Sequence, residues 1–203
     1  MAKHDYHQAF ERQIAAARPG STLLLHSCCG PCSAAVLERL GEHFAVTLYF
    51  YNPNIHPEAE YQKRLEAQKT VLERMTPRYP AKLLAAPYDP QPFAAVTAGL
   101  EREPEGGARC TRCFFLRLEE TAKLAHAQGF DYFTTTLTVS PHKDPERLNE
   151  TGSRLGEEYH VAYLPADFKK KGGYQRSVEL AKAWGLYRQN YCGCLYNSTI
   201  TVP

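Results

Sequence analysis

Residues 22–33 read TLLLHSCCGPCS, and this stretch decides how the chain is expected to fold. The short apolar run Thr22–Ser27 predicts a buried β-strand. A helical stretch, Ser33–Glu42, follows it, and three cysteines occupy the junction. The sequence therefore predicts a strand–loop–helix unit that presents thiols at the end of a strand.

The same alternation of strand and helix continues along the chain. Further strands are predicted at Val46–Tyr51, Lys82–Tyr88, Tyr132–Val139 and Val161–Pro165, and helices at Pro57–Met75, Cys113–Gln128, Asp144–Tyr159 and Gly173–Trp184. Strands separated by helices of this length indicate βαβ units and a sheet covered on both faces. We expect an α/β, three-layer Rossmann-like fold with a mainly parallel sheet. Residues 1–203 should form a single catalytic domain, in which residues 1–19 are an N-terminal helical extension.

Composition limits the classes of function. Hydrophobic residues make up 43% of the 203 residues and charged residues 23%, as in ordinary soluble domains. The net charge of +2 is too small to predict a nucleic-acid partner by itself. No run approaches the roughly 20 apolar residues of a membrane helix, and the N-terminus lacks the apolar segment of a signal peptide. We therefore expect no membrane association and a cytoplasmic location, where thiols stay reduced.

The seven cysteines fall into three groups that need an explanation other than disulfides. The groups are Cys28, Cys29 and Cys32; Cys110 and Cys113; and Cys192 and Cys194. The first follows a predicted strand and opens a helix, whose dipole favours thiolates. The second is predicted to sit on a Gly-rich loop and to start another helix, and the third lies near the C-terminus.

Several interpretations of these cysteines compete. Scattered buried cysteines seldom gather as CCxxC, CxxC and CxC. The segment CGPC at 29–32 is typical of a thioredoxin-like dithiol, but that reading leaves five cysteines without a role. Two CxxC pairs could bind zinc, whereas seven thiolates fit a larger centre better. The residues favour an iron–sulfur cluster over zinc.

Five segments resemble the cobalamin-independent epoxyqueuosine reductases. They are HSCCGPCS (26–33), FYNPNIHPEAEYQKR (50–64), RCTRCFFLRLEETAKLA (109–125), GFDYFTTTLTVSPHK (129–143) and DFKKKGGYQRSVELAKAWGLYRQNYCGC (167–194). The resemblance implies reduction of epoxyqueuosine to queuosine in the anticodon stem-loop of a tRNA with a GUN-type anticodon. It also implies a [4Fe–4S] cluster and an additional mononuclear iron. Some members of the family carry Asp at the position of Cys32, so the division of the seven cysteines between the two metals stays open.

Candidate residues for proton transfer and for substrate binding lie in predicted loops or at strand ends. The candidate general acids are Tyr51, His56, Asp89, Asp167 and Tyr191, and no spacing selects among them. The candidate substrate- and RNA-binding residues are Asn52, Asn54, Tyr61, Arg64, Ser140, Lys143, Lys169, Lys170, Lys171, Tyr174, Arg176 and Arg188. Ammonium groups on a Gly-containing loop can follow phosphates, and an aromatic ring can stack on an unpaired base. The alternative is that the asparagines only shape turns and the lysines form a solvated surface.

Three other functions remain as alternatives. A cluster-dependent tRNA thiolase would need a phosphate-binding loop after the first strand, where this chain has HSCCG instead. A thioredoxin-like oxidoreductase would hold no metal, and an RNA-binding module stabilised by zinc would hold no labile sulfide. Because no flavin or nicotinamide motif is visible, we expect an external electron donor such as a ferredoxin or a flavodoxin-like reductase.

Overall fold

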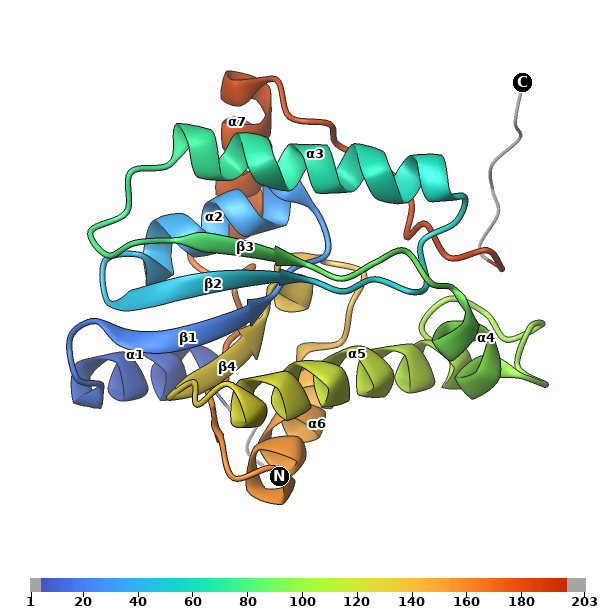
Figure 1. The fold of residues 1–203 in the computed structure, drawn as a ribbon, viewed down its shortest axis with the longest axis horizontal. Coiled ribbons are helices and arrows are strands. Elements are labelled where there is room, and N and C mark those ends of the chain that lie inside the picture. The colour runs from blue at the N-terminus through green and yellow to red at the C-terminus, as the bar shows by residue number, and fades with distance from the viewer. Residues whose placement is uncertain (1–4, 197–203) are drawn as a thin grey trace.

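A parallel sheet forms the centre of the molecule (Figure 1). The structure is a computed structural model that describes residues 5–196. Its strands are β1 (Ser21–His26), β2 (Phe44–Phe50), β3 (Lys82–Ala85), β4 (Tyr132–Thr135) and β5 (Ala162–Tyr163). They lie in the order β3-β2-β1-β4-β5, and every neighbouring pair is parallel. The predicted α/β class and parallel sheet are confirmed.

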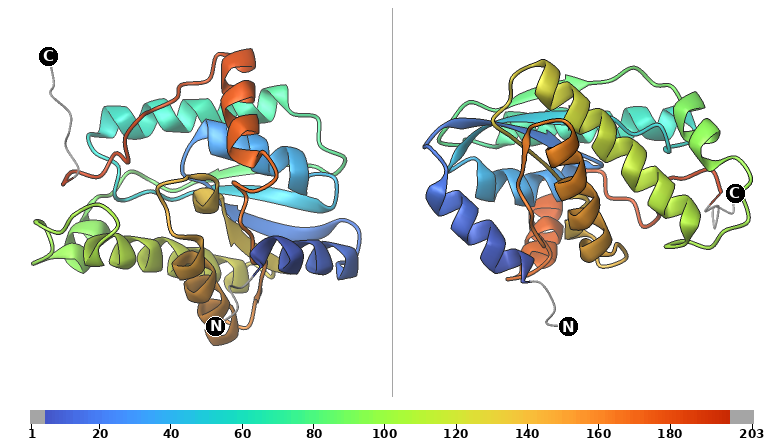
Figure 2. Two further views of the ribbon diagram at one scale, coloured as in Figure 1. Left: turned by 180° about the vertical axis from the view of Figure 1, so that it is seen from behind. Right: turned by 90° about the horizontal axis from the view of Figure 1, so that it is seen from below.

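Helices cover both faces of this sheet, which gives the three predicted layers. The helices are α1 (Tyr6–Ala16), α2 (Gly30–Leu40), α3 (Glu58–Arg74), α4 (Gln91–Thr97), α5 (Ala108–Ala127), α6 (Pro145–Glu158) and α7 (Gly173–Trp184). Helices α2, α3 and α7 lie on one face, and α5 and α6 lie on the other (Figures 1 and 2). None of the described helices is long and apolar enough to cross a membrane.

Strand β1 shows why the sequence forms this architecture. Leu23 and Leu25 belong to the apolar cluster beneath α2 and α7, whereas Leu24 belongs to the cluster beneath α5 and α6. All three side chains are fully buried. A strand covered on both faces needs a continuous apolar run, and TLLLH supplies one.

The strand order also places the functional edge. Strands β2 and β3 extend the sheet on one side of β1, and the chain then returns to form β4 on the other side. Ligands of open α/β sheets bind where the strand order reverses, outside the carboxyl ends of the strands. Here that position lies between β1 and β4, next to the CCxxC segment.

Several predicted boundaries were wrong. The strand predicted over Tyr132–Val139 ends at Thr135, and residues Thr136–Val139 form a 3-10 helix, η1. The chain turns there because the Thr135 hydroxyl accepts a hydrogen bond from the Leu137 amide. The strands predicted to Tyr88 and over Val161–Pro165 are shorter, at Lys82–Ala85 and Ala162–Tyr163. Helix α4 was not predicted. Helix α5 begins at Ala108, so Cys110 lies in its first turn rather than on a loop.

Candidate metal centre

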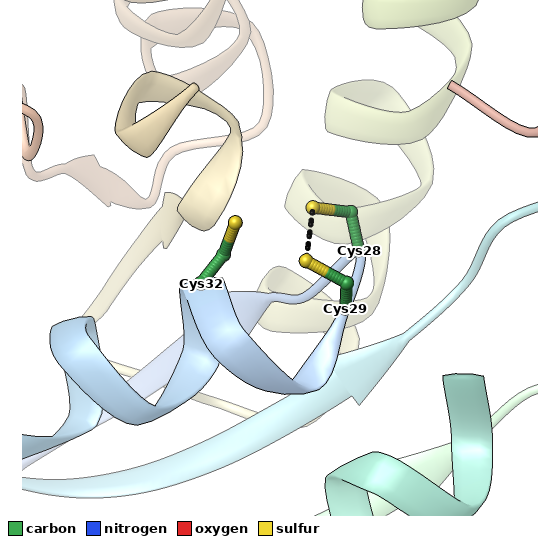
Figure 3. Close-up of side chains that lie close together, drawn as sticks. All are labelled: Cys28, Cys29 and Cys32. Carbon is green, nitrogen blue, oxygen red and sulfur yellow. Dashed lines mark hydrogen bonds between the residues drawn. The ribbon is translucent and has the colours of Figure 1, made fainter. Parts of the chain in front are cut away.

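Three cysteine sulfurs meet at the carboxyl end of β1 (Figure 3). Cys29 is the N-cap residue of α2, and Cys32 lies in the first turn of that helix, which carries Pro31 near its start. The Sγ atoms of Cys28, Cys29 and Cys32 lie within 4.8 Å of one another, and those of Cys28 and Cys29 are 3.8 Å apart. This cysteine triad could hold a metal.

Electrostatics distinguish Cys28 from the other two thiols. Hydrogen bonds from the Cys29 and Cys32 thiols hold the pKa of Cys28 well below its usual range, and Arg117 and Lys143 act in the same direction. The same sharing raises the pKa of Cys29 to about 11 and that of Cys32 well above its usual value. Cys28 is therefore the first thiolate to form, and metal binding would have to displace the protons of the others.

The triad opens into a cavity of about 350 Å³. Cys192 lines the same cavity, so a fourth thiol reaches the site from the C-terminal segment. Five of the residues predicted to act on the substrate or to bind RNA also line it, namely Ser140, Lys143, Tyr174, Arg188 and Tyr191. The side chains come from the loop after η1, from α7 and from the segment that follows α7. The fold thus gathers thiols, cations and aromatic rings around one space large enough for a nucleoside.

A second, smaller cavity of about 40 Å³ lies against Cys28 and Cys192. Three cationic residues line it, Arg64, Arg117 and Lys143. Arg64 Nη2 is buried there without a hydrogen-bond partner. Buried donors and cations without partners are costly, so this arrangement fits an anionic group. A thiolate-bound cluster, with its sulfides and net negative charge, is such a group.

The remaining cysteines lie farther along the same edge. Cys113 is buried on α5, and burial raises its pKa to about 12. Cys194 packs with it beside Phe93 and Leu116. Cys110 Sγ accepts a hydrogen bond from the Gly106 amide. Across residues 5–196, these sulfurs do not form a group as compact as the triad.

Two further predicted residues, Asn54 and Arg64, line only the small cavity. Apart from these two and the five that line the large cavity, none of the predicted substrate-binding or proton-donating residues lines either cavity. Asn52 and Tyr61 are buried, where Asn52 Nδ2 donates to the Ser27 carbonyl and the Tyr61 hydroxyl donates to the Ala86 carbonyl. Tyr51 stacks on Tyr49 with ring centroids 5.8 Å apart. These three residues have structural contacts that do not depend on a substrate.

The other candidates lie at or near the protein surface, except Asp167, which is buried. Asp89 accepts a hydrogen bond from the Gln91 amide, and His56 lies beside Tyr88. Most of the basic residues are paired: Lys169 with Asp167, Lys170 with Asp5, and Arg176 with Glu38. Lys171 is exposed with a φ of 54°. The lysine run is thus partly neutralised by its own neighbours.

Sequence reasoning missed two residues at the centre of the edge, His26 and Arg117. Both are buried, and Arg117 Nε donates to His26 Nε2 at 3.2 Å. Arg117 lies one helical turn after Cys113, and this spacing was the available signal. His26 lies inside the predicted strand Thr22–Ser27 and Arg117 inside the predicted helix Cys113–Gln128, so neither residue was assigned a functional role.

The fold and the site define a Rossmann-like α/β protein with a thiol-rich centre at the switch point of its sheet. Residues 23–199 match the family described as epoxyqueuosine reductase QueH. The chain belongs to this family.

Individual relatives agree with that assignment. Epoxyqueuosine reductase QueH of Staphylococcus epidermidis is 45% identical over 86% of this chain and 75% of that protein. The protein of the same name from Streptococcus pyogenes is 44% identical over 86% of this chain and 69% of its own length.

Among solved structures, a predicted subunit of tRNA methyltransferase from Methanocaldococcus jannaschii is similar with a TM-score of 0.48 and 16% identity, covering 80% of this chain and 74% of that one.

Proposed function

We propose that this protein is an epoxyqueuosine reductase that removes the epoxide oxygen of epoxyqueuosine in tRNA and produces queuosine. The observation that carries the proposal is the cavity in which the triad and Cys192 meet Lys143, Tyr174 and Arg188, in a chain of this family. The overall reaction consumes two electrons and two protons, releases water and leaves a carbon–carbon double bond. The site must therefore deliver both electrons and protons to one bound nucleoside.

We further propose that the thiols hold iron. Cys28, Cys29, Cys32 and Cys192 share one cavity and would hold a [4Fe–4S] cluster. Cys110, Cys113 and Cys194 are the candidate ligands of the additional mononuclear iron. When bound, these metals would supply electrons and Lewis acidity. Because the sequence shows no flavin or nicotinamide motif, an external donor such as a ferredoxin or flavodoxin-like reductase would supply the electrons.

Tyr191 is the candidate proton donor, because it alone of Tyr51, His56, Asp89, Asp167 and Tyr191 lines the two cavities next to the cysteines. Burial and the carboxylate of Glu60 raise its pKa, so its hydroxyl keeps its proton at neutral pH. A neutral phenol can donate a hydrogen bond to the departing oxygen. Lys143, on the opposite loop, offers a cation to the same space.

The tRNA would enter over Tyr174 and Arg188. Tyr174 is 39% exposed, and Arg188 Nη2 donates to its hydroxyl at 2.9 Å. An exposed ring braced by a guanidinium is suited to stack on a base that has left the anticodon loop. Asn54 and Ser140 line the walls of the two cavities. A cytoplasmic location would give the protein access to tRNA and to a reducing environment.

The experiment that tests the function is conversion of the nucleoside. Anaerobically purified protein, reconstituted with iron and sulfide and reduced with dithionite, is incubated with tRNA that contains epoxyqueuosine. Digestion and mass spectrometry should find queuosine, and a Cys29→Ala variant should form less than about one hundredth as much. Iron-loaded wild-type protein that leaves epoxyqueuosine unchanged would overturn the proposal. Transfer of sulfur to tRNA would favour the thiolase instead.

A further inference from the structure

Arg117 is a fully buried cation that has only neutral hydrogen-bond acceptors. Its Nε donates to His26 Nε2, and one Nη donates to Asn52 Oδ1. Within residues 5–196, no carboxylate lies within 4.0 Å of its guanidinium. Arg64, the other arginine at the small cavity, is paired with Glu60 at 2.7 Å. The charge of Arg117 is therefore uncompensated by protein carboxylates, and an unpaired buried charge is costly.

The acceptors of Arg117 are held in place by their own partners. A guanidinium is protonated at every physiological pH, so its Nε–H can bond to His26 only if His26 Nε2 is unprotonated. The other ring nitrogen, Nδ1, lies 2.8 Å from Thr135 Oγ1, and Nε2 also lies 3.2 Å from the Tyr51 carbonyl oxygen, so the ring is held on both sides. Asn52 is fixed in turn because its Nδ2 donates to the Ser27 carbonyl.

What the guanidinium faces is sulfur. Its remaining Nη lies 4.0 Å from Cys113 Sγ. It also lines the small cavity together with Cys28 and Cys192. Arg117 thus lies near both Cys28 of the triad and Cys113 of α5, where ligated thiolates would gather negative charge.

We propose that Arg117 is a positioning residue that compensates the charge of the metal centre and raises its reduction potential. Adding an electron to a thiolate-bound cluster increases its negative charge, and a fixed cation at close range in a buried site favours that step. His26 and Asn52 orient the guanidinium without neutralising it. Because its partners are neutral rather than carboxylates, the full positive charge of Arg117 remains available to interact with the sulfurs. This inference rests on the proposed iron–sulfur function.

The test is a redox titration of reconstituted protein, followed by the visible and EPR signals of the cluster. Arg117→Met removes the charge with little change in volume, and Arg117→Lys keeps it. Arg112→Met is the matched control, because Arg112 is exposed on the same helix. We expect Arg117→Met to make one-electron reduction at least tenfold less favourable, a fall of about 59 mV. Arg117→Lys should remain near wild type, and Arg112→Met should leave the potential unchanged.

Equal potentials in wild type and Arg117→Met, or equal falls in Arg117→Met and Arg117→Lys, would overturn the inference. If Arg117→Met does not retain iron, thermal unfolding supplies the second measurement. In the metal-free protein, relief of the unpaired charge should offset the loss of the hydrogen bonds to His26 and Asn52, so the variant should be about as stable as metal-free wild type. A metal-free Arg117→Met protein that is much less stable than metal-free wild type would contradict the inference. Wild-type protein that holds no cluster would instead refute the proposed function.

Discussion

Arg64 Nη1 donates to the carbonyl oxygen of Cys192 at 2.9 Å, which ties helix α3 to the C-terminal cysteines. The adjoining Gly193 carbonyl accepts a hydrogen bond from the His56 amide. The backbones of Cys194 and Ile55 form an isolated antiparallel β-bridge. Residues more than 120 positions apart in the chain are thereby joined beside the triad. The place of the fourth thiol depends on these contacts rather than on a helix or strand.

Gly193→Ala is expected to displace this fourth thiol. Gly193 has a φ of 89°, where an L side chain is strained, and an added Cβ would lie 2.6 Å from Arg64 Nη2. The guanidinium is buried and cannot move aside freely. We expect the variant to fold but to retain less than half of the wild-type iron after reconstitution, measured with a colorimetric chelator. Gly99→Ala, also at positive φ but with open space around it, is the control and should keep full iron content.

Glu60→Gln should weaken the same anchor in a pH-dependent way. Burial raises the pKa of Glu60, but hydrogen bonds from Tyr187 and Arg64 outweigh burial and hold the pKa below its usual value of 4.5. A carboxylate with a lowered pKa contributes stability above its unfolded pKa, and the contribution is lost as the pH falls through the folded value. Breaking one partner from a buried pair costs about 3 kcal/mol.

Urea unfolding of metal-free protein measures this effect. The variant should be less stable than wild type by about 3 kcal/mol near pH 7, and the difference should shrink as the pH is lowered below about 4. A difference that stays constant over this range would mean that the charge of Glu60 contributes nothing. Glu66→Gln, in an exposed pair with Lys69 on the same helix, should change stability by less than about 0.5 kcal/mol.

Tyr191→Phe is expected to slow the chemical step. Removing a proton donor costs about a hundredfold or more in rate. Binding of tRNA and the spectrum of the cluster should change little, because the ring stays in place beside Arg64, 5.3 Å from its guanidinium. Single-turnover rates in pre-reduced protein measure the effect. Tyr187→Phe is the control: its hydroxyl also bonds Glu60, at 2.7 Å, but it does not line the large cavity. Equal rates for both variants would exclude Tyr191 as the donor.

Tyr174→Ala should weaken tRNA binding, whereas Tyr174→Phe should not. Stacking of a base on an aromatic ring contributes about 1–3 kcal/mol. We therefore expect the Kd for an anticodon stem-loop to rise about tenfold in the alanine variant, as measured by fluorescence anisotropy at fixed salt. Loss of affinity in the phenylalanine variant as well would assign the effect to the hydrogen bond with Arg188 instead of to the ring.

The fold and the cysteine triad could be predicted from the sequence because both depend on local sequence patterns. The run TLLLH at residues 22–26 is apolar on both faces, and the CCxxC segment follows it directly. Once right-handed crossovers are assumed, the loops after β1 and β4 must share an edge. Lys143 and Ser140 could be assigned to that edge for the same reason.

The remaining features depend on contacts between distant segments. Cys192 reaches the triad through Arg64, and Arg117 meets His26 across 91 positions. A single sequence does not encode such pairs in any readable spacing. The Thr135–Leu137 contact, which ends β4, likewise competes with a good strand pattern. The pairing of Lys169 with Asp167 and of Lys170 with Asp5 could not be predicted from the sequence, and RNA binding by these lysines stays a prediction.

The most direct test of a redox metal centre at the triad is the content of iron, zinc and acid-labile sulfide in anaerobically purified protein. We predict about four sulfides and more than four irons per chain. Cys32→Ala and Cys192→Ala should lower both numbers, whereas a change at the exposed Arg112 should not. One zinc per chain without sulfide would contradict the account and leave a zinc-stabilised binding module as the better description.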